Sequence, residues 1–240
     1  MKIIVTKNYE EMSREAAKIV LGVVKADPEA VLGLATGSTP IGMYREMIRD
    51  HEENGTSYRN VRTVNLDEYA GLDETSDQSY VYFMRKNLFD SLDIDRKNTN
   101  IENGKAADRE KECERYNALL HEMQQSVQVL GIGSNGHIAF NEPGTPFSSE
   151  THIVDLTEST IRDNSRLFSR IEDVPRQAFT MGLKNIMNAK KIVILANGKN
   201  KAKAVYGLVK GPVTEQLPAS VLQLHPDCTV VVDEEAASLL

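Results

Sequence analysis

The chain alternates short apolar runs with longer amphipathic stretches along most of its length. Short runs rich in β-branched residues predict buried strands, and apolar residues spaced three and four apart predict helices. The predicted strands are 2–5, 31–36, 61–66, 127–132, 152–157, 190–196 and 229–233. The predicted helices are 9–26, 41–53, 78–92, 109–125, 158–169 and 199–209.

This alternation indicates an α/β protein with a mainly parallel, doubly wound sheet between two layers of helices. The sequence contains no linker or internal repeat, so we expect residues 1–240 to form a single three-layer α-β-α domain. A stretch with Pro and Ser at 143–150 interrupts the pattern. We therefore expect an insertion at about 145–175 that forms a mobile lid. Ligands of such sheets bind outside the carboxyl ends of the strands.

Composition excludes several classes of protein. The 240 residues are 40% hydrophobic and 26% charged, as in an ordinary globular protein. No apolar run is long enough to span a bilayer and no signal-peptide pattern opens the chain, so we expect a cytoplasmic protein without membrane contact. A net charge of −7 with no basic block argues against nucleic-acid binding. Cys113 and Cys228 are predicted to be free thiols.

The strand predicted at 31–36 is followed by Gly37, Ser38, Thr39 and Pro40. Proline suits the first turn of a helix, and turn amides together with a helix N-terminus form an anion site. A plain turn is the alternative interpretation. No Gly-Lys-Ser/Thr follows, as an ATP-binding P-loop requires, so a sugar phosphate is a better candidate than ATP.

The strand predicted at 61–66 is followed by the acidic pair Asp67 and Glu68. Such a pair is often a helix cap or an exposed turn, but its place at a strand end favours a functional role. Successive side chains alternate on extended backbone, so only one of the two carboxylates is expected to face the crevice.

Residues 131–136 match the glycine spacing of dinucleotide-binding loops. That motif requires a helix to begin at its third glycine. Here Pro143, Gly144 and Pro146 follow closely, which leaves no room for a full crossover helix. The context argues against a nicotinamide cofactor.

The same loop offers a candidate site for proton transfer. His137 follows a strand, with Asn135 and Glu142 nearby. Histidine exchanges protons near neutral pH, and a neighbouring carboxylate orients its ring. A structural or solvated histidine is the alternative, but the strand end and the two polar neighbours favour catalysis.

Six segments in the same order resemble the glucosamine-6-phosphate deaminase family across nearly the whole chain. They are LATGSTP, NLDEY, GIGSNGHIAFNEPG, NSR at 164–166, GKNKAKA at 198–204 and LQLHP at 222–226. The resemblance implies conversion of glucosamine 6-phosphate and water into fructose 6-phosphate and ammonia. It also implies that no metal or organic cofactor takes part.

The resemblance implies a role for each matched residue. Asp67 takes the proton from C2 of the sugar, and His137 moves the proton that opens the pyranose ring, with Glu142 holding it. Many members carry Asp where this chain has Asn135, which cannot ionise and is expected to act as a hydrogen-bonding support. The residues implied to hold the phosphate are Gly37, Ser38, Thr39, Arg166 and Lys201.

This sequence departs from the allosteric members of the family in two places that concern regulation. Allosteric members carry basic residues after the Asn-Glu-Pro loop and a longer tail, whereas this chain reads THIVDL at 151–156 and ends at Leu240. We therefore expect no amino-sugar phosphate activator, and a monomer or small homo-oligomer rather than a hexamer.

Two other functions fit the same fold. A 6-phosphogluconolactonase shares the phosphate turn, but lactone hydrolysis abstracts no carbon-bound proton, so Asp67 favours the deaminase. A sugar-phosphate-sensing module would need a DNA-binding domain, and the acidic sequence contains nothing resembling one.

Overall fold

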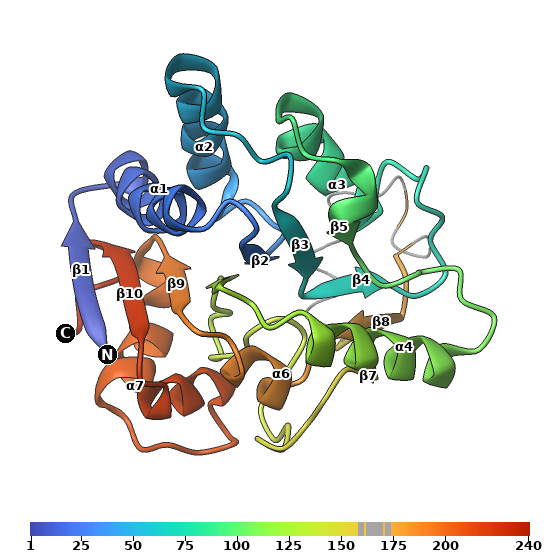
Figure 1. Ribbon diagram of the computed structural model, residues 1–240. Coiled ribbons are helices and arrows are strands. Elements are labelled where there is room, and N and C mark those ends of the chain that lie inside the picture. The colour runs from blue at the N-terminus through green and yellow to red at the C-terminus, as the bar shows by residue number, and fades with distance from the viewer. Residues whose placement is uncertain (158–160, 162–169, 171–173) are drawn as a thin grey trace.

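The computed structural model describes residues 1–157, 161, 170 and 174–240. Within these residues the main sheet has seven parallel strands in the order β1-β10-β9-β6-β2-β3-β5. The predicted α/β class with a mainly parallel sheet is confirmed (Figure 1). Its strands are β1 (Lys2–Thr6), β2 (Val31–Leu34), β3 (Arg62–Asn65), β5 (Thr99–Asn100), β6 (Val127–Leu130), β9 (Ile192–Ala196) and β10 (Cys228–Asp233).

Helices cover both faces of this sheet (Figure 1). On one face lie α1 (Tyr9–Ala26), α2 (Ile41–Asn54) and α3 (Tyr80–Asn87). On the other lie α4 (Arg109–Glu122), α6 (Leu183–Met187) and α7 (Ala202–Lys210). The 3₁₀ turns are Phe89–Ser91, Arg96–Asn98, Lys199–Lys201 and Pro218–Leu224.

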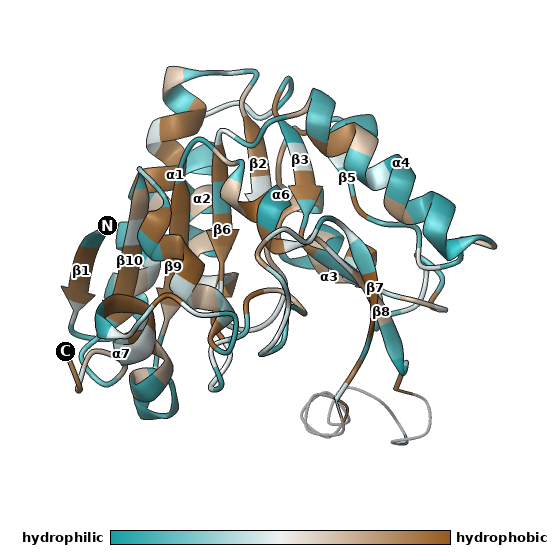
Figure 2. Cartoon of the chain, turned by 90° about the horizontal axis from the view of Figure 1, so that it is seen from below, coloured by the Kyte–Doolittle hydropathy of each residue, from teal (hydrophilic) through white to brown (hydrophobic). Residues whose placement is uncertain are grey.

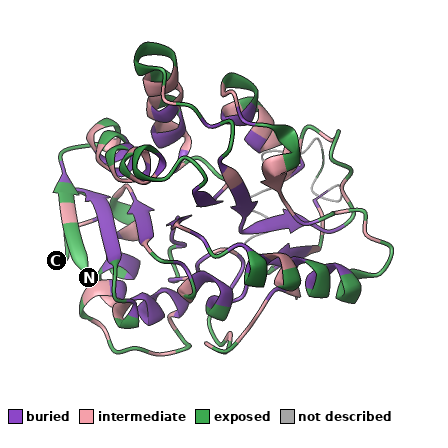
Figure 3. Ribbon diagram, in the orientation of Figure 1, coloured by how far each residue is buried: buried purple, intermediate pink, exposed green. Residues whose placement is uncertain are grey.

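The core is divided by the sheet into two apolar layers. Met12 of α1 and Tyr44 of α2 pack with Leu32 on one face, and Tyr116 of α4 and Val205 of α7 belong to the cluster on the other. Figure 2 shows the hydrophobic colouring concentrated on the strands, and Figure 3 shows the central strands buried while the outer helix surfaces are exposed. Burial on both faces explains why these strands read as continuous apolar runs.

The order of the strands reverses direction between β2 and β6. From β2 the chain builds outward to β3 and β5, and it then returns to the other side of β2 with β6 and β9. Neighbouring connections therefore leave in opposite directions at the carboxyl ends of β2 and β6, which opens a crevice there. Both glycine-containing segments singled out in the sequence, 37–39 and 131–136, begin at this crevice.

A second, three-stranded antiparallel sheet was not anticipated by the alternation of strands and helices. It has the order β4-β8-β7, with β4 (Asp67–Tyr69), β8 (Gln177–Thr180) and β7 (His152–Asp155). The predicted strand at 152–157 thus exists but lies outside the parallel sheet. Only Leu66 separates the end of β3 from β4, so the chain passes directly from the large sheet into the small one at Asp67.

Several boundaries differ from those predicted. The helix expected at 78–92 ends at Asn87, and a 3₁₀ turn follows. Helix α6 and strands β4, β5 and β8 were missed because each is too short to show a periodic pattern. The helix expected at 158–169 falls mainly outside the described residues, as does part of the expected lid at 145–175, which stays a prediction.

Two smaller expectations concern cysteines and membrane spans. Cys113 and Cys228 are free and buried, as predicted. In the part of the chain that the structure describes, no helix is long and apolar enough to cross a bilayer.

Gly182 marks a close approach between the small sheet and the segment before β7. The amide of Lys184 donates to the carbonyl of Ser149 at 2.9 Å, and the amide of Leu183 donates to its hydroxyl at 3.0 Å. A Cβ at Gly182 would lie 2.2 Å from the Ser149 carbonyl oxygen and 2.4 Å from that of Glu150. Both are backbone atoms held by hydrogen bonds, so they have little freedom to move.

We expect Gly182→Ala to lower the free energy of unfolding by about 1–3 kcal/mol, because the methyl group overpacks this junction. Urea denaturation followed by circular dichroism measures the effect. The matched control is Gly22→Ala, where a Cβ on exposed α1 meets nothing within 4 Å. That variant should be stabilised by about 0.5–1 kcal/mol. Equal effects of the two substitutions would contradict the packing argument.

Candidate functional site

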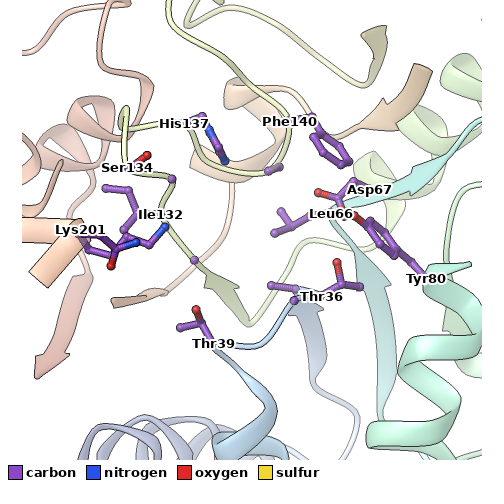
Figure 4. A pocket seen from close by; sticks show the side chains of 16 residues that line it. Thr36, Thr39, Leu66, Asp67, Tyr80, Ile132, Ser134, His137, Phe140 and Lys201 are labelled. Carbon is purple, nitrogen blue, oxygen red and sulfur yellow. The ribbon is translucent and has the colours of Figure 1, made fainter. Parts of the chain in front are cut away.

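A cavity of about 320 Å³ opens at the carboxyl ends of β2, β3, β6 and β9 (Figure 4). It therefore lies at the point where the strand order reverses, as expected for a ligand site in this class of sheet. The residues that line it are Ala35, Thr36, Gly37, Thr39, Leu66, Asp67, Tyr80, Gly131, Ile132, Gly133, Ser134, His137, Ala139, Phe140, Asn200 and Lys201.

One end of the cavity is built for an anion. Gly37 has φ +89°, a conformation that other residues rarely adopt, and the turn 37–39 leads into α2. The Tyr9 hydroxyl donates to the Ser38 carbonyl at 3.0 Å and accepts from the Gly42 amide at 2.8 Å, which fixes the turn against α1. The N-terminal end of α2 carries partial positive charge.

Lys201 reaches the same end from the connection between β9 and α7. The amide of Gly198, at the start of this connection, donates to both carboxylate oxygens of Asp233 at 3.0 Å. This pairing holds the connection against β10. Figure 4 shows Lys201 and Thr39 at one end of the cavity and Asp67, Tyr80 and Phe140 at the other.

Asp67 lies at the opposite end and is 7% exposed. Burial, and to a smaller extent the negative charge of neighbouring Glu68, raises the pKa of its carboxyl group from 3.8 to about 8. A carboxylate whose pKa lies near the working pH is a much stronger base than a solvated one. This group can accept a proton from carbon.

Glu68 points to the other side of β4, as the alternation of side chains predicts. It is 1% exposed, and its carboxylate accepts hydrogen bonds from the backbone amides of Tyr69, Tyr80 and Val81. Burial raises the pKa of Glu68 and these hydrogen bonds lower it, and the net result is a pKa of about 7. Only Asp67 of the acidic pair lines the cavity.

The loop after β6 is folded tightly around His137. The amide of Gly133 donates to the His137 carbonyl at 2.9 Å, and a Cβ at Gly133 would lie 2.2 Å from the imidazole ring. Glycine at this position therefore lets the ring lie against the backbone and face the cavity. Gly136 has φ +86°, which turns the chain back toward β6. In the described structure no helix begins between β6 and β7, so the loop lacks the helix that a dinucleotide-binding motif requires.

Asn135, His137 and Glu142 come together in this loop. The side-chain amide of Asn135 donates to Glu142 at 2.7 Å, and its carbonyl oxygen accepts from the His137 backbone amide at 3.1 Å. The His137 Nδ1 lies 3.6 Å from the Glu142 Oε1, within ion-pair distance but longer than a hydrogen bond. Asn135 thus links the carboxylate to the backbone that carries the histidine.

The structure gathers most of the residues singled out in the sequence around one cavity. Gly37, Thr39, Asp67, His137 and Lys201 line it. Ser38 does not line it but lies between Gly37 and Thr39, which do, while Asn135 and Glu142 contact the lining residue His137. Arg166 lies outside the described residues.

Two aromatic residues of the cavity were missed by sequence reasoning. Tyr80 opens α3 and Phe140 lies in the loop after His137; their rings are stacked 6.4 Å apart. Neither belongs to a strand end, and no local pattern marks them as neighbours of Asp67. A metal-binding cluster of three or more His, Cys, Asp or Glu is not found among the described residues.

Comparison of the sequence with known families gives one match over most of the chain. Residues 6–231 match the family described as glucosamine-6-phosphate isomerases and 6-phosphogluconolactonase. A glucosamine-6-phosphate deaminase of Clostridium perfringens is 52% identical, with 100% of both chains covered. One from Thermoanaerobacter pseudethanolicus is 52% identical over 100% of this chain and 95% of its own.

Solved structures give the same picture for the fold. A monomeric glucosamine-6-phosphate deaminase superposes with a TM-score of 0.98 at 48% identity, covering 100% of both chains. A 6-phosphogluconolactonase from Trypanosoma brucei superposes with a TM-score of 0.81 at 21% identity, covering 100% of this chain and 98% of its own. At this identity, the similarity to the lactonase shows a shared fold and no more.

The burial of Asp67 has a consequence for stability. Between pH 3.8 and about 8 the folded protein keeps a proton on Asp67 that the unfolded chain has lost. The contribution of this group to the free energy of unfolding therefore falls as pH rises through that window. We expect Asp67→Asn to gain stability relative to the wild type between pH 5 and pH 8, measured by urea denaturation.

Asp73→Asn is the matched control. The pKa of Asp73 is lowered, chiefly by hydrogen bonds from Thr75, so this group stays ionised in both states across the same range. Its difference from the wild type should be the same at pH 5 and pH 8. An Asp67→Asn difference that does not change with pH would contradict a raised pKa at Asp67.

Proposed function

The chain belongs to the family of glucosamine-6-phosphate isomerases and 6-phosphogluconolactonases, and we propose that it converts glucosamine 6-phosphate and water into fructose 6-phosphate and ammonia. It is thus an enzyme of amino-sugar metabolism. The reaction combines ring opening, a shift of the carbonyl group from C1 to C2, and loss of the amine.

The observation that carries this proposal is a buried carboxyl group facing a cationic end of the same cavity. Asp67 and Lys201 line opposite ends, as Figure 4 shows. In glucosamine 6-phosphate the acidic C–H bond at C2 and the phosphate on C6 lie toward opposite ends of the molecule. A substrate with its phosphate beside Lys201 and Thr39 would present C2 toward Asp67.

Sequence similarity favours the deaminase over the lactonase. Relatives named glucosamine-6-phosphate deaminase are about half identical over the whole chain, whereas the lactonase structure shares 21% of residues. Hydrolysis of a lactone needs a base to activate water but removes no proton from carbon. The raised pKa of Asp67, about 8, suits the removal of a weakly acidic carbon-bound proton.

Enolisation is assigned to Asp67. Its carboxylate would take the proton from C2 of the open-chain sugar, which leaves an enolamine between C1 and C2. Return of a proton to C1 gives an imine at C2, and water then releases ammonia and the ketone. The aromatic walls formed by Tyr80 and Phe140 limit the access of water to the base, which maintains its basicity.

Ring opening is assigned to His137, supported by Glu142 and Asn135. The imidazole lines the cavity, and a protonated ring would be stabilised by the Glu142 carboxylate 3.6 Å away. The hydrogen bond from Asn135 keeps that carboxylate in place without adding a second negative charge. Position 135 therefore supports the pair in this proposal and does not itself transfer a proton.

The phosphate is assigned to the turn 37–39, Lys201 and Arg166. An arginine would add a bidentate contact to the point charge of the lysine. Arg166 belongs to the segment at about 145–175 that the sequence predicts to be a lid. A monomer or small homo-oligomer is proposed because a relative of 48% identity is described as monomeric. A cytoplasmic location stays a prediction.

The direct test is to incubate the purified protein with glucosamine 6-phosphate, without added cofactor, and to assay ammonia and fructose 6-phosphate together. We expect equal amounts of both, and a rate loss of about 10²–10⁴ in Asp67→Asn because the base is removed. Hydrolysis of 6-phosphogluconolactone is assayed in parallel. Turnover of the lactone without release of ammonia would replace this proposal with the lactonase.

A second prediction concerns the phosphate. Lys201→Ala should raise KM for glucosamine 6-phosphate about 10- to 100-fold, since a charge-assisted hydrogen bond contributes about 1.5–3 kcal/mol. Lys199→Ala is the matched control, because this lysine lies on the same turn but does not line the cavity. Equal KM values in the two variants would remove Lys201 from the phosphate site.

A further inference from the structure

We propose that Glu68 is a positioning residue for the enolisation base: it ties the first turn of α3 to β4 and so holds the ring of Tyr80 beside Asp67. The inference rests on the proposed function, which makes Asp67 the base. Glu68 itself faces away from the cavity and touches no substrate in this arrangement.

The first step is the way in which α3 begins. The Glu68 carboxylate accepts from the amide of Tyr80 at 2.9 and 3.0 Å and from the amide of Val81 at 3.1 Å. The Ser79 hydroxyl accepts from the next amide, that of Tyr82, at 3.1 Å. Two of the amides that a helix N-terminus leaves unpaired are thus satisfied by a residue of a different element.

The charge of Glu68 matters at this position. The first turn of α3 contains no acidic residue of its own. A negative charge near a helix N-terminus is stabilising, and here it is supplied from β4. The hydrogen bonds therefore fix the location of the helix relative to the strand that carries Asp67, rather than only capping it.

The second step leads from α3 to the cavity. Tyr80 is both the first residue of the helix and a lining residue. Its ring centre lies 4.8 Å from that of Tyr69 and 6.4 Å from that of Phe140, and Figure 4 shows Tyr80 and Phe140 beside Asp67. Displacement of the first turn would move this wall and admit water to the base.

Other ionisable groups face Asp67 and Glu68 from the elements packed around them. The charged or titratable neighbours in the described structure are Tyr44 of α2, Tyr69 of β4, Tyr80 of α3, Glu102 after β5 and Tyr116 of α4, with His137 and Lys201 across the cavity. Glu68 is the one whose charge, after burial, raises the pKa of Asp67.

Glu68→Gln tests the proposal in the full-length enzyme. Glutamine keeps the length of the side chain but removes the charge and one of the two acceptors. We expect kcat to fall about 10- to 100-fold, because misplacement near a reacting group is costly. The acid limb of kcat/KM should move to lower pH, since both the lost charge and the added water lower the pKa of Asp67. KM should change little, because the phosphate end is untouched.

Glu102→Gln is the matched control. Glu102 is also 1% exposed, and among the described residues its carboxylate has no hydrogen-bond partner, so the same chemical change leaves α3 untouched. It should keep the acid limb of the wild type. Glu68→Asp retains the charge and should restore the acid limb while kcat stays reduced. An unchanged kcat and acid limb in Glu68→Gln, or an equal shift in Glu102→Gln, would overturn the proposal.

A measurement without turnover separates this inference from the function itself. Hydrogen exchange of the Tyr80 and Val81 amides should be faster in Glu68→Gln than in the wild type or Glu102→Gln. Unchanged exchange would overturn the anchoring role even if the enzyme is active. If the wild type releases no ammonia, the proposed function fails, while the exchange result still decides whether Glu68 holds α3. If Glu68→Gln does not fold, the comparison is made with Glu68→Asp.

Discussion

The removal of Asp67 from water is the constraint on which the rest of the site depends. A carboxylate loses stability when it is buried, and the two causes that raise the pKa of Asp67 are its burial and the negative charge of Glu68. The surrounding structure must therefore supply the energy that keeps this group dry. Tyr80, Phe140 and the junction between the two sheets provide the enclosure. In the proposed reaction this burial serves to raise the basicity of the Asp67 carboxylate.

The same junction explains why the small antiparallel sheet matters to chemistry. Asp67 pairs with Thr180 across β4 and β8, and the Thr180 hydroxyl accepts the backbone amide of Phe140 at 3.1 Å. One strand pair thus fixes both the base and the loop that leads from His137 to Glu142. The two groups proposed to move protons are held by a common element, although they are 70 residues apart in the chain.

The fold alone does not decide between a deaminase and a lactonase, because both share it. The anion-binding end of the cavity suits sugar phosphates in general, so it does not distinguish the two reactions. The distinction lies at the opposite end, where the requirement is a base strong enough to deprotonate carbon. We therefore attribute the choice between the two reactions to the surroundings of the Asp67 carboxyl group and not to the fold that both enzymes share.

The sequence by itself determined the parallel sheet, most of its covering helices and several strand-end residues that line the cavity, among them Gly37, Asp67 and His137. These follow from local rules: apolar periodicity marks buried strands, and carboxyl ends of parallel strands converge on one edge. The alternation of side chains on extended backbone also predicted that only one of Asp67 and Glu68 would face the crevice. Tertiary structure alone decided that β8 pairs with β4, that Tyr80 and Phe140 enclose the base, and that Glu68 caps a helix twelve residues away. These contacts join short segments with no periodic signal, so only the packing of the whole chain brings them together.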